Sequence, residues 1–177
     1  MTAWVALLRG VNVNGVTVRS AELADLFREL GFESVRTVLA SGNVAFEAPA
    51  GTSARTELKA RIETALRERF GYDAWILLPT VNELTEVVEA FPFDEKDADR
   101  QPYAIFCVDD ATRDEIVEAA ASFDEDVDPV AAGAGVVYWS PRVGTTVDTP
   151  LGKLLGRARF KPSTTSRNLR TLRKIIG

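Results

Sequence analysis

The apolar residues of the first 78 positions change their spacing in a fixed order, and this order restricts the fold more than any other feature. Runs typical of strands occur at residues 4–8, 35–40, 44–46 and 74–78. Helical spacing occurs at residues 20–30 and 53–69, and Gly31 and Gly71 follow as helix stops. The predicted order is therefore strand, helix, strand, strand, helix, strand.

This order is typical of a ferredoxin-like βαββαβ unit, in which an antiparallel sheet carries two helices on one face. The segment Trp4–Leu8 is apolar on both faces, which predicts a central, covered strand. After a helix capped by Thr80, the chain gives strand, helix, strand, strand, helix, and then a last helix predicted to begin near Thr165. We therefore predict an α+β protein of two lobes, residues 1–78 and 79–177, the second a related βαββα unit with a C-terminal helix.

The residue types exclude several kinds of chemistry. The chain has no histidine and a single cysteine, Cys107, so it cannot form a Ser-His or Cys-His pair, a histidine zinc site or an intrachain disulfide. Two acidic loops, residues 94–100 and 124–128, lack the central glycine and final glutamate of a calcium loop. We predict no metal and no cofactor, and because no nucleophile or base stands out, an enzymatic function is left open.

The expected compartment follows from the hydropathy pattern. No apolar run approaches the roughly 18 residues that a membrane span needs. The apolar N-terminal residues 1–8 are followed, not preceded, by a basic residue, which is the reverse of a secretion signal. We therefore predict a cytoplasmic protein without a membrane segment, and the sequence leaves its oligomeric state undetermined.

Charge is distributed unevenly along the chain. Residues 141–177 contain nine basic residues and one acidic residue, a net +8, whereas the other 140 residues carry 12 − 25 = −13. A basic segment on an acidic protein can be a nucleic-acid surface. It can equally dock on the acidic part of the chain and neutralise it, which we favour because an acidic body repels polyanions.

The loop after the first strand is the first candidate for a binding site. It carries Arg9, Gly10 and Asn12, followed by the turn signal Asn14-Gly15. A flexible backbone beside a guanidinium can hold an anion. The alternative is that the Asn and Gly residues only build the turn, and the known phosphate-loop glycine patterns are absent.

The segment Ser41-Gly42-Asn43 is the second candidate. Its residues suit a tight hairpin between two strands, which is the simpler interpretation. A ligand-binding role for Ser41 and Asn43 is the alternative. Ser41 lacks the surrounding glycines of a nucleophile elbow, so it is not predicted to be a nucleophile.

The start of the predicted terminal helix is the third candidate. If Thr165 caps that helix, Arg167 and Asn168 lie in its first turn, where a cation opposes the helix dipole. An anionic ligand or a partner carboxylate would explain the arginine. We also formulate the hypothesis that this segment and the loop after the first strand meet in space.

Four segments together resemble one family. They are Leu7–Gly15, Ser41–Val44, Tyr138–Arg142 and Thr165–Asn168 with Thr171. They resemble the bacterial proteins of domain-of-unknown-function family 1697, and the resemblance covers nearly the whole chain. It implies a two-lobed α+β fold with ferredoxin-like parts, and because the family has no established activity, it assigns no catalytic residue. Asn14 departs from the family's usual Gly-Gly at this turn.

The function predicted from the sequence is binding of a small anionic or nucleotide-like ligand. The predicted ligand-binding residues are Arg9, Gly10, Asn12, Ser41, Asn43, Arg167 and Asn168. The alternatives are a nucleic-acid-associated protein that uses its basic C-terminal segment, and an enzyme of unknown reaction that works without histidine.

Overall fold

The computed structural model describes residues 1–9, 17–39 and 42–177 of the chain. It divides into two compact units. The first comprises Met1–Leu84 with Ile175–Gly177, and the second comprises Thr85–Lys174. We describe each unit by itself.

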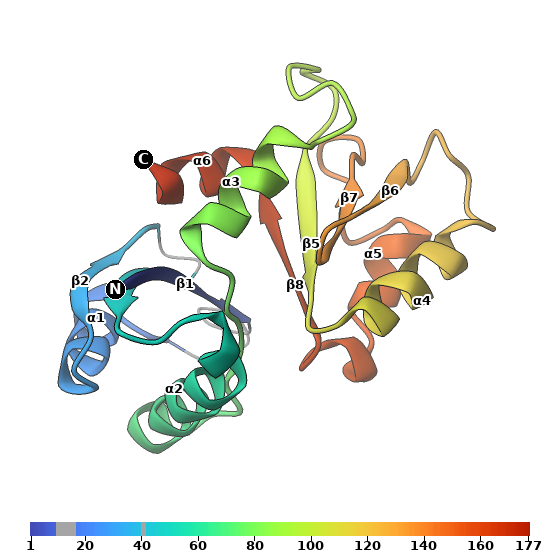
Figure 1. Cartoon of the computed structure of the whole chain (residues 1–177). Coiled ribbons are helices and arrows are strands. Elements are labelled where there is room, and N and C mark those ends of the chain that lie inside the picture. Colours follow the sequence, from blue (N-terminus) through green and yellow to red (C-terminus); the bar gives the residue numbers. More distant parts are fainter. Residues whose placement is uncertain (10–16, 40–41) are drawn as a thin grey trace. The chain divides into compact units, whose positions relative to one another are not determined.

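The first unit contains a four-stranded antiparallel sheet in the order β2-β3-β1-β4. Its strands are β1 (Thr2–Arg9), β2 (Glu33–Thr37), β3 (Asn43–Ala48) and β4 (Trp75–Leu77). The helices of this unit are α1 (Ser20–Glu29), η1 (Thr52–Ala54) and α2 (Arg55–Phe70). The predicted βαββαβ order and the central position of β1 are confirmed (Figure 1).

The two faces of this sheet bury different residues of β1. Trp4, Ala6 and Leu8 belong to one hydrophobic core with the apolar residues of α1 and α2. Val5 and Leu7 point to the opposite face because side chains alternate along a strand, and they are fully buried as well. We call this opposite side the back face of the first sheet.

Helix termini of the first unit follow the sequence with one exception. Gly71 ends α2 with a φ of +66°, the left-handed conformation that glycine adopts without strain. Ser20, a residue type that often caps helices, is instead the first residue of α1 and follows Arg19, whose side chain makes no capping bond. Helix α3 (Val81–Glu89) begins as predicted after Thr80, whose Oγ1 accepts a hydrogen bond from Glu83 N at 3.1 Å.

The second unit repeats the same architecture. Its antiparallel sheet has the order β6-β7-β5-β8, from strands β5 (Tyr103–Cys107), β6 (Val130–Gly133), β7 (Val136–Trp139) and β8 (Thr164–Asn168). Its helices are α4 (Asp110–Ala120), α5 (Pro150–Leu155) and η2 (Ala158–Phe160). The residues of α4 and α5 share a hydrophobic core with one face of this sheet (Figure 1). The unit is thus βαββαβ, with one strand more than predicted.

The additional strand β8 corrects the prediction of a helix from Thr165. Residues 164–168 pair with β5 along its whole length, and α6 (Leu169–Ile176) begins only afterwards. Thr164 and Thr165 are buried β-branched residues, which suit a strand more than a helix terminus. The helical spacing of apolar residues in α6 was visible in the sequence. The sequence did not show that β5 has an edge with which residues 164–168 can pair.

The two units also correspond at the point where the last strand of each ends and the next helix begins. Trp4 is paired with Phe46 and Thr80, and Tyr103 is paired in the same way with Trp139 and Asn168. Thr80 caps α3, while Asn168 Oδ1 accepts from Arg170 N at 2.9 Å at the start of α6. The repeated unit is therefore βαββαβα, although no repeat is evident in the sequence.

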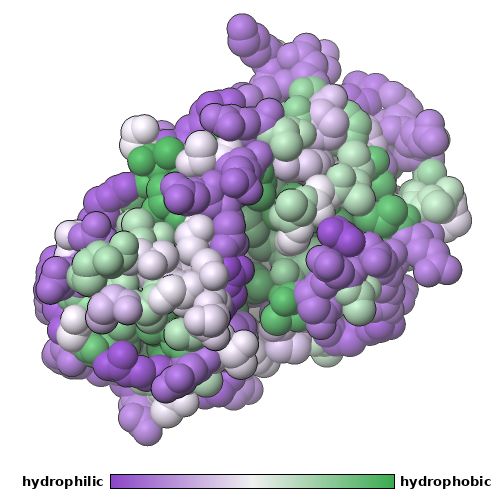
Figure 2. All heavy atoms as spheres, viewed as in Figure 1, coloured by the Kyte–Doolittle hydropathy of each residue, from purple (hydrophilic) through white to green (hydrophobic). Residues whose placement is uncertain are grey.

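The surface is mainly hydrophilic. Figure 2 shows hydrophilic side chains spread over the face in view, with apolar side chains in patches between them. Among the described residues, no helix combines the length and hydropathy needed to cross a bilayer.

Candidate functional site

Arg9 is the last residue of β1 and pairs with Trp75 of β4. Because it lies two residues beyond Leu7, its side chain is on the back face of the first sheet. The side chain is half-buried, and this burial lowers the pKa of the Arg9 guanidinium from its usual value. An arginine remains charged at neutral pH even so, which makes this end of the back face positive.

Asn43 begins β3 opposite Leu7, so it also lies on the back face and is a diagonal neighbour of Arg9. It is completely buried, and its Nδ2 donates a hydrogen bond to Val38 O at 2.8 Å. Gly42 precedes it with a φ of +81°, a conformation that favours glycine. The contact with Val38 closes this connection between β2 and β3, as the hairpin interpretation predicts.

Arg36 is a second arginine on the back face, and sequence reasoning missed it. It pairs with Ala45 of β3, and its Nη2 donates to the carbonyl oxygen of Ile175 near the end of α6. The two residues are 139 positions apart in the sequence. No local pattern could have indicated this contact.

Three of the predicted ligand-binding residues, Gly10, Asn12 and Ser41, lie outside the described residues. In sequence, Gly10 follows Arg9 directly, and Ser41 is separated from Asn43 by one residue. Their predicted role in ligand binding stays a prediction.

Arg167 lies in β8 rather than in a helix, so the argument from an unfavourable helix dipole is wrong. It pairs with Ala104 on the sheet face opposite the core that contains α4 and α5. The residue is buried, with 8% of its surface exposed. Its Nη1 donates to Thr165 Oγ1 at 2.7 Å and to Ser166 O at 3.0 Å, both of which are neutral acceptors.

Asn168 points to the other face of the second sheet because it follows Arg167 in a strand. Its Oδ1 caps α6 through Arg170 N, and it lies opposite Tyr103. The side chains of Arg167 and Asn168 therefore lie on opposite faces of the second sheet. The hypothesis that the Arg9 and Arg167 segments meet stays a prediction, since these residues belong to different compact units.

A family model described as a protein of unknown function (DUF1697) matches residues 1–138. The chain belongs to the DUF1697 family. The resemblance to this family is thereby confirmed over residues 1–138, which include the segments Leu7–Gly15 and Ser41–Val44.

The fold is shared with a bacterial protein of known structure. A solved structure of the conserved bacterial protein SP0830 from Streptococcus pneumoniae matches with a TM-score of 0.80 and 22% sequence identity. The match covers 99% of this chain and 97% of that chain. No curated protein matches the chain significantly. Membership in DUF1697 therefore fixes the fold and leaves the ligand to be argued from the residues.

In this DUF1697 protein, three of the nine basic residues of the C-terminal segment are paired with carboxylates of their own unit. Arg142 bonds Asp126 at 3.3 Å, and Arg173 holds both oxygens of Glu95 at 2.7 Å. Arg159 pairs with Glu115. These contacts favour the interpretation that the segment docks on the acidic part of the chain.

The acidic loops of the family member are organised by their own backbone. Asp94, Asp97 and Asp124 each accept a hydrogen bond from the amide two residues onward, at 2.8–2.9 Å. Within residues 1–9, 17–39 and 42–177, no group of three metal-ligating side chains is close enough to hold an ion.

Cys107 is expected to react slowly with thiol reagents. Burial raises the pKa of its thiol to about 12, so only a very small thiolate fraction exists near pH 8. We expect labelling of the native protein by Ellman's reagent at pH 8 to be at least about a hundredfold slower than labelling in denaturant. Equal rates would show that Cys107 is accessible in the native protein.

Proposed function

We propose that the chain is a binding protein for a small anionic, nucleotide-like ligand. The proposed site is the polar end of the back face of the first sheet, where β1 ends and β3 begins. Arg9 and Asn43 belong to it, and Gly10, Asn12 and Ser41 are its proposed neighbours from the adjoining sequence.

The observation that carries this proposal is the joint position of Arg9 and Asn43. They come from two separate motifs of the sequence and lie on one face at the same end of paired strands. The guanidinium of Arg9 is partly removed from water, which an approaching anion would offset. If the motifs of Arg9 and Asn43 only built turns, they would have no reason to lie together beside a charged, half-buried side chain.

The ligand class follows from the chemistry of these side chains. A guanidinium presents a planar fork of donors that fits the oxygens of a phosphate or a carboxylate. Trp75 pairs with Arg9 on the same face and is half-buried, so an aromatic ring stands beside the cation. A ring of this kind can stack with a nucleobase, which supports a nucleotide over inorganic phosphate.

Arg167 is proposed as a second ligand-binding residue, in the second unit. It is buried, and the acceptors Thr165 Oγ1 and Ser166 O orient its Nη1. Asn168 is assigned a positioning role instead, because its side chain caps α6.

Replacement of Arg9 tests the proposal directly. We expect AMP to raise the melting temperature of the unmodified protein and Arg9→Ala to weaken AMP binding at least about tenfold, as for loss of a charged hydrogen bond. Isothermal titration of AMP and of sodium phosphate gives the affinities. Arg28→Ala is the matched control, since Arg28 is exposed on α1 and pairs only at the surface with Asp25, at 3.1 Å. Equal AMP binding by both variants would refute the site.

Titrations with single-stranded RNA and with AMP at different salt concentrations distinguish nucleic-acid binding from binding of a small ligand. The exposed residues Lys153, Arg157 and Lys161 favour that alternative. A single-stranded RNA held by these cations should lose affinity steeply between 50 and 200 mM salt. AMP in a partly buried site should respond much less, and Arg9→Ala should not affect RNA binding.

A further inference from the structure

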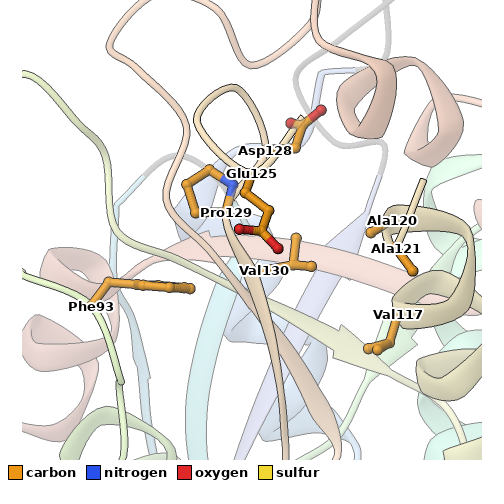
Figure 3. A pocket seen from close by; sticks show the side chains of 8 residues that line it. All are labelled: Phe93, Val117, Ala120, Ala121, Glu125, Asp128, Pro129 and Val130. Carbon is orange, nitrogen blue, oxygen red and sulfur yellow. The ribbon is translucent and has the colours of Figure 1, made fainter. Parts of the chain in front are cut away.

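The second unit contains a hollow of about 530 Å³ that is separate from the proposed anion site. It lies beside the C-terminal end of α4 and the segment that leads into β6 (Figure 3). Its lining residues are Phe93, Val117, Ala120, Ala121, Glu125, Asp128, Pro129 and Val130. Its volume is within the range of small-molecule sites.

Six of the eight residues that line this hollow are apolar, and the other two, Glu125 and Asp128, are acidic. Figure 3 shows the carboxylate of Glu125 directed inward, between Phe93 and the valines of α4 and β6. Among the described residues that line the hollow, none is a lysine or arginine. Glu125 is an exposed residue, so water hydrates its carboxylate when the hollow is empty. A ligand that covers the carboxylate must replace this hydration, which a positive group does and an apolar group does not, and an anionic ligand would be repelled.

The surrounding groups reinforce this negative character. The hollow adjoins the C-terminal end of α4 at Ala120 and Ala121, where the helix dipole favours a cation. Asp128 is 2% exposed and adds a second carboxylate in the wall. Its oxygens accept from Trp139 Nε1 at 3.0 Å and Leu151 N at 3.1 Å, two neutral donors that leave its charge in place.

Two arginines that bond the acidic stretch before Asp128 are directed to another carboxylate. Arg100 and Arg142 both bond Asp126, at 3.0 and 3.3 Å. Arg100 also donates to Ser140 O at 2.7 Å. The carboxylate that neutralises these arginines is thus Asp126, which does not line the hollow.

We propose that this hollow binds a small amphipathic cation, with an ammonium group on Glu125 and an apolar body against Phe93, Val117 and Val130. Charge complementarity selects this occupant: the polar end must be positive, and the remainder must be apolar. The hollow shares no lining residue with the proposed anion-binding residues Arg9, Asn43 and Arg167.

The experiment is a titration of the ¹⁵N-labelled full chain with 2-phenylethylammonium, followed by NMR. We expect the amide signals of Ala121 and Val130 to shift and to give a saturable binding curve. The carboxylate analogue 3-phenylpropanoate should leave them in place. Equal shifts with both compounds would show that the hollow does not select charge and would overturn the proposal.

Two substitutions test the individual contributions. Glu125→Gln should weaken 2-phenylethylammonium binding at least fivefold, whereas Glu118→Gln, at an exposed residue of α4 outside the hollow, should leave it unchanged. Ala121→Phe places a ring in the hollow from an exposed position and should abolish binding without loss of stability. Unchanged binding by either Glu125→Gln or Ala121→Phe would refute the site.

Discussion

Asp128→Ala is expected to lower the free energy of unfolding of the second unit by about 2–5 kcal/mol. The buried carboxylate joins two distant elements, since one oxygen accepts from Trp139 Nε1 on β7 and the other from Leu151 N in the first turn of α5. Alanine leaves both donors buried without acceptors, and each unsatisfied donor costs about 1–3 kcal/mol. The total is a large part of a typical folding free energy of about 5–15 kcal/mol.

Urea unfolding of the full chain, followed by the NMR signals of amides in the second unit, measures this loss. Asp126→Ala is the matched control, because Asp126 lies two positions away but is exposed and forms surface ion pairs with Arg100 and Arg142. We expect the control to cost less than about 1 kcal/mol. Comparable losses for both variants would mean that the two buried hydrogen bonds of Asp128 contribute little.

Asp128 also shows what the sequence could not reveal. It lies in an acidic stretch that suggested a solvated loop, and nothing in its neighbours indicates a partner. Its importance depends on Trp139 and on a backbone amide 23 residues away. Such contacts depend on tertiary packing, which the spacing of apolar residues along the sequence does not reveal.

The fold was more accessible than the site because it is encoded locally. The alternation in β1 and the helical spacing of α1 and α2 predicted the first unit, and both depend only on neighbouring residues. Strand β8 was missed because Thr164 and Thr165 resemble a helix cap in isolation. Only the pairing of this segment with β5 makes it a strand.

The candidate site was predictable in part for the same reason. Arg9 and Asn43 stand beside turn residues that mark strand ends, so their proximity follows from a correct strand order. The directions of the Arg167 and Asn168 side chains could not be predicted, because the segment was expected to be helical and is a strand. Helices and strands point consecutive side chains in different directions. Arg36 gave no signal, because its partner is a backbone carbonyl at the other end of the chain.

Phe46→Ala is expected to have the second large effect, about 3–5 kcal/mol on the stability of the first unit. Phe46 is 2% exposed, and its ring stacks on Phe32 at 4.5 Å between centroids and meets Phe27 at 5.3 Å. Alanine removes the ring from the middle of this cluster and leaves a cavity that strands and helices on both sides cannot close.

The measurement is urea unfolding combined with native-state hydrogen exchange, which reports each unit separately. Val147→Ala, at a side chain that is 75% exposed, is the control and should change stability by less than about 0.5 kcal/mol. We propose that residues 1–78 and 79–177 are separate domains, and the two destabilising variants test this division. If it holds, Phe46→Ala accelerates exchange only in the first unit and Asp128→Ala only in the second, since each removes contacts internal to one core. Equal acceleration in both units by either variant would mean that the chain unfolds as one cooperative body and that the proposed boundary has no thermodynamic meaning.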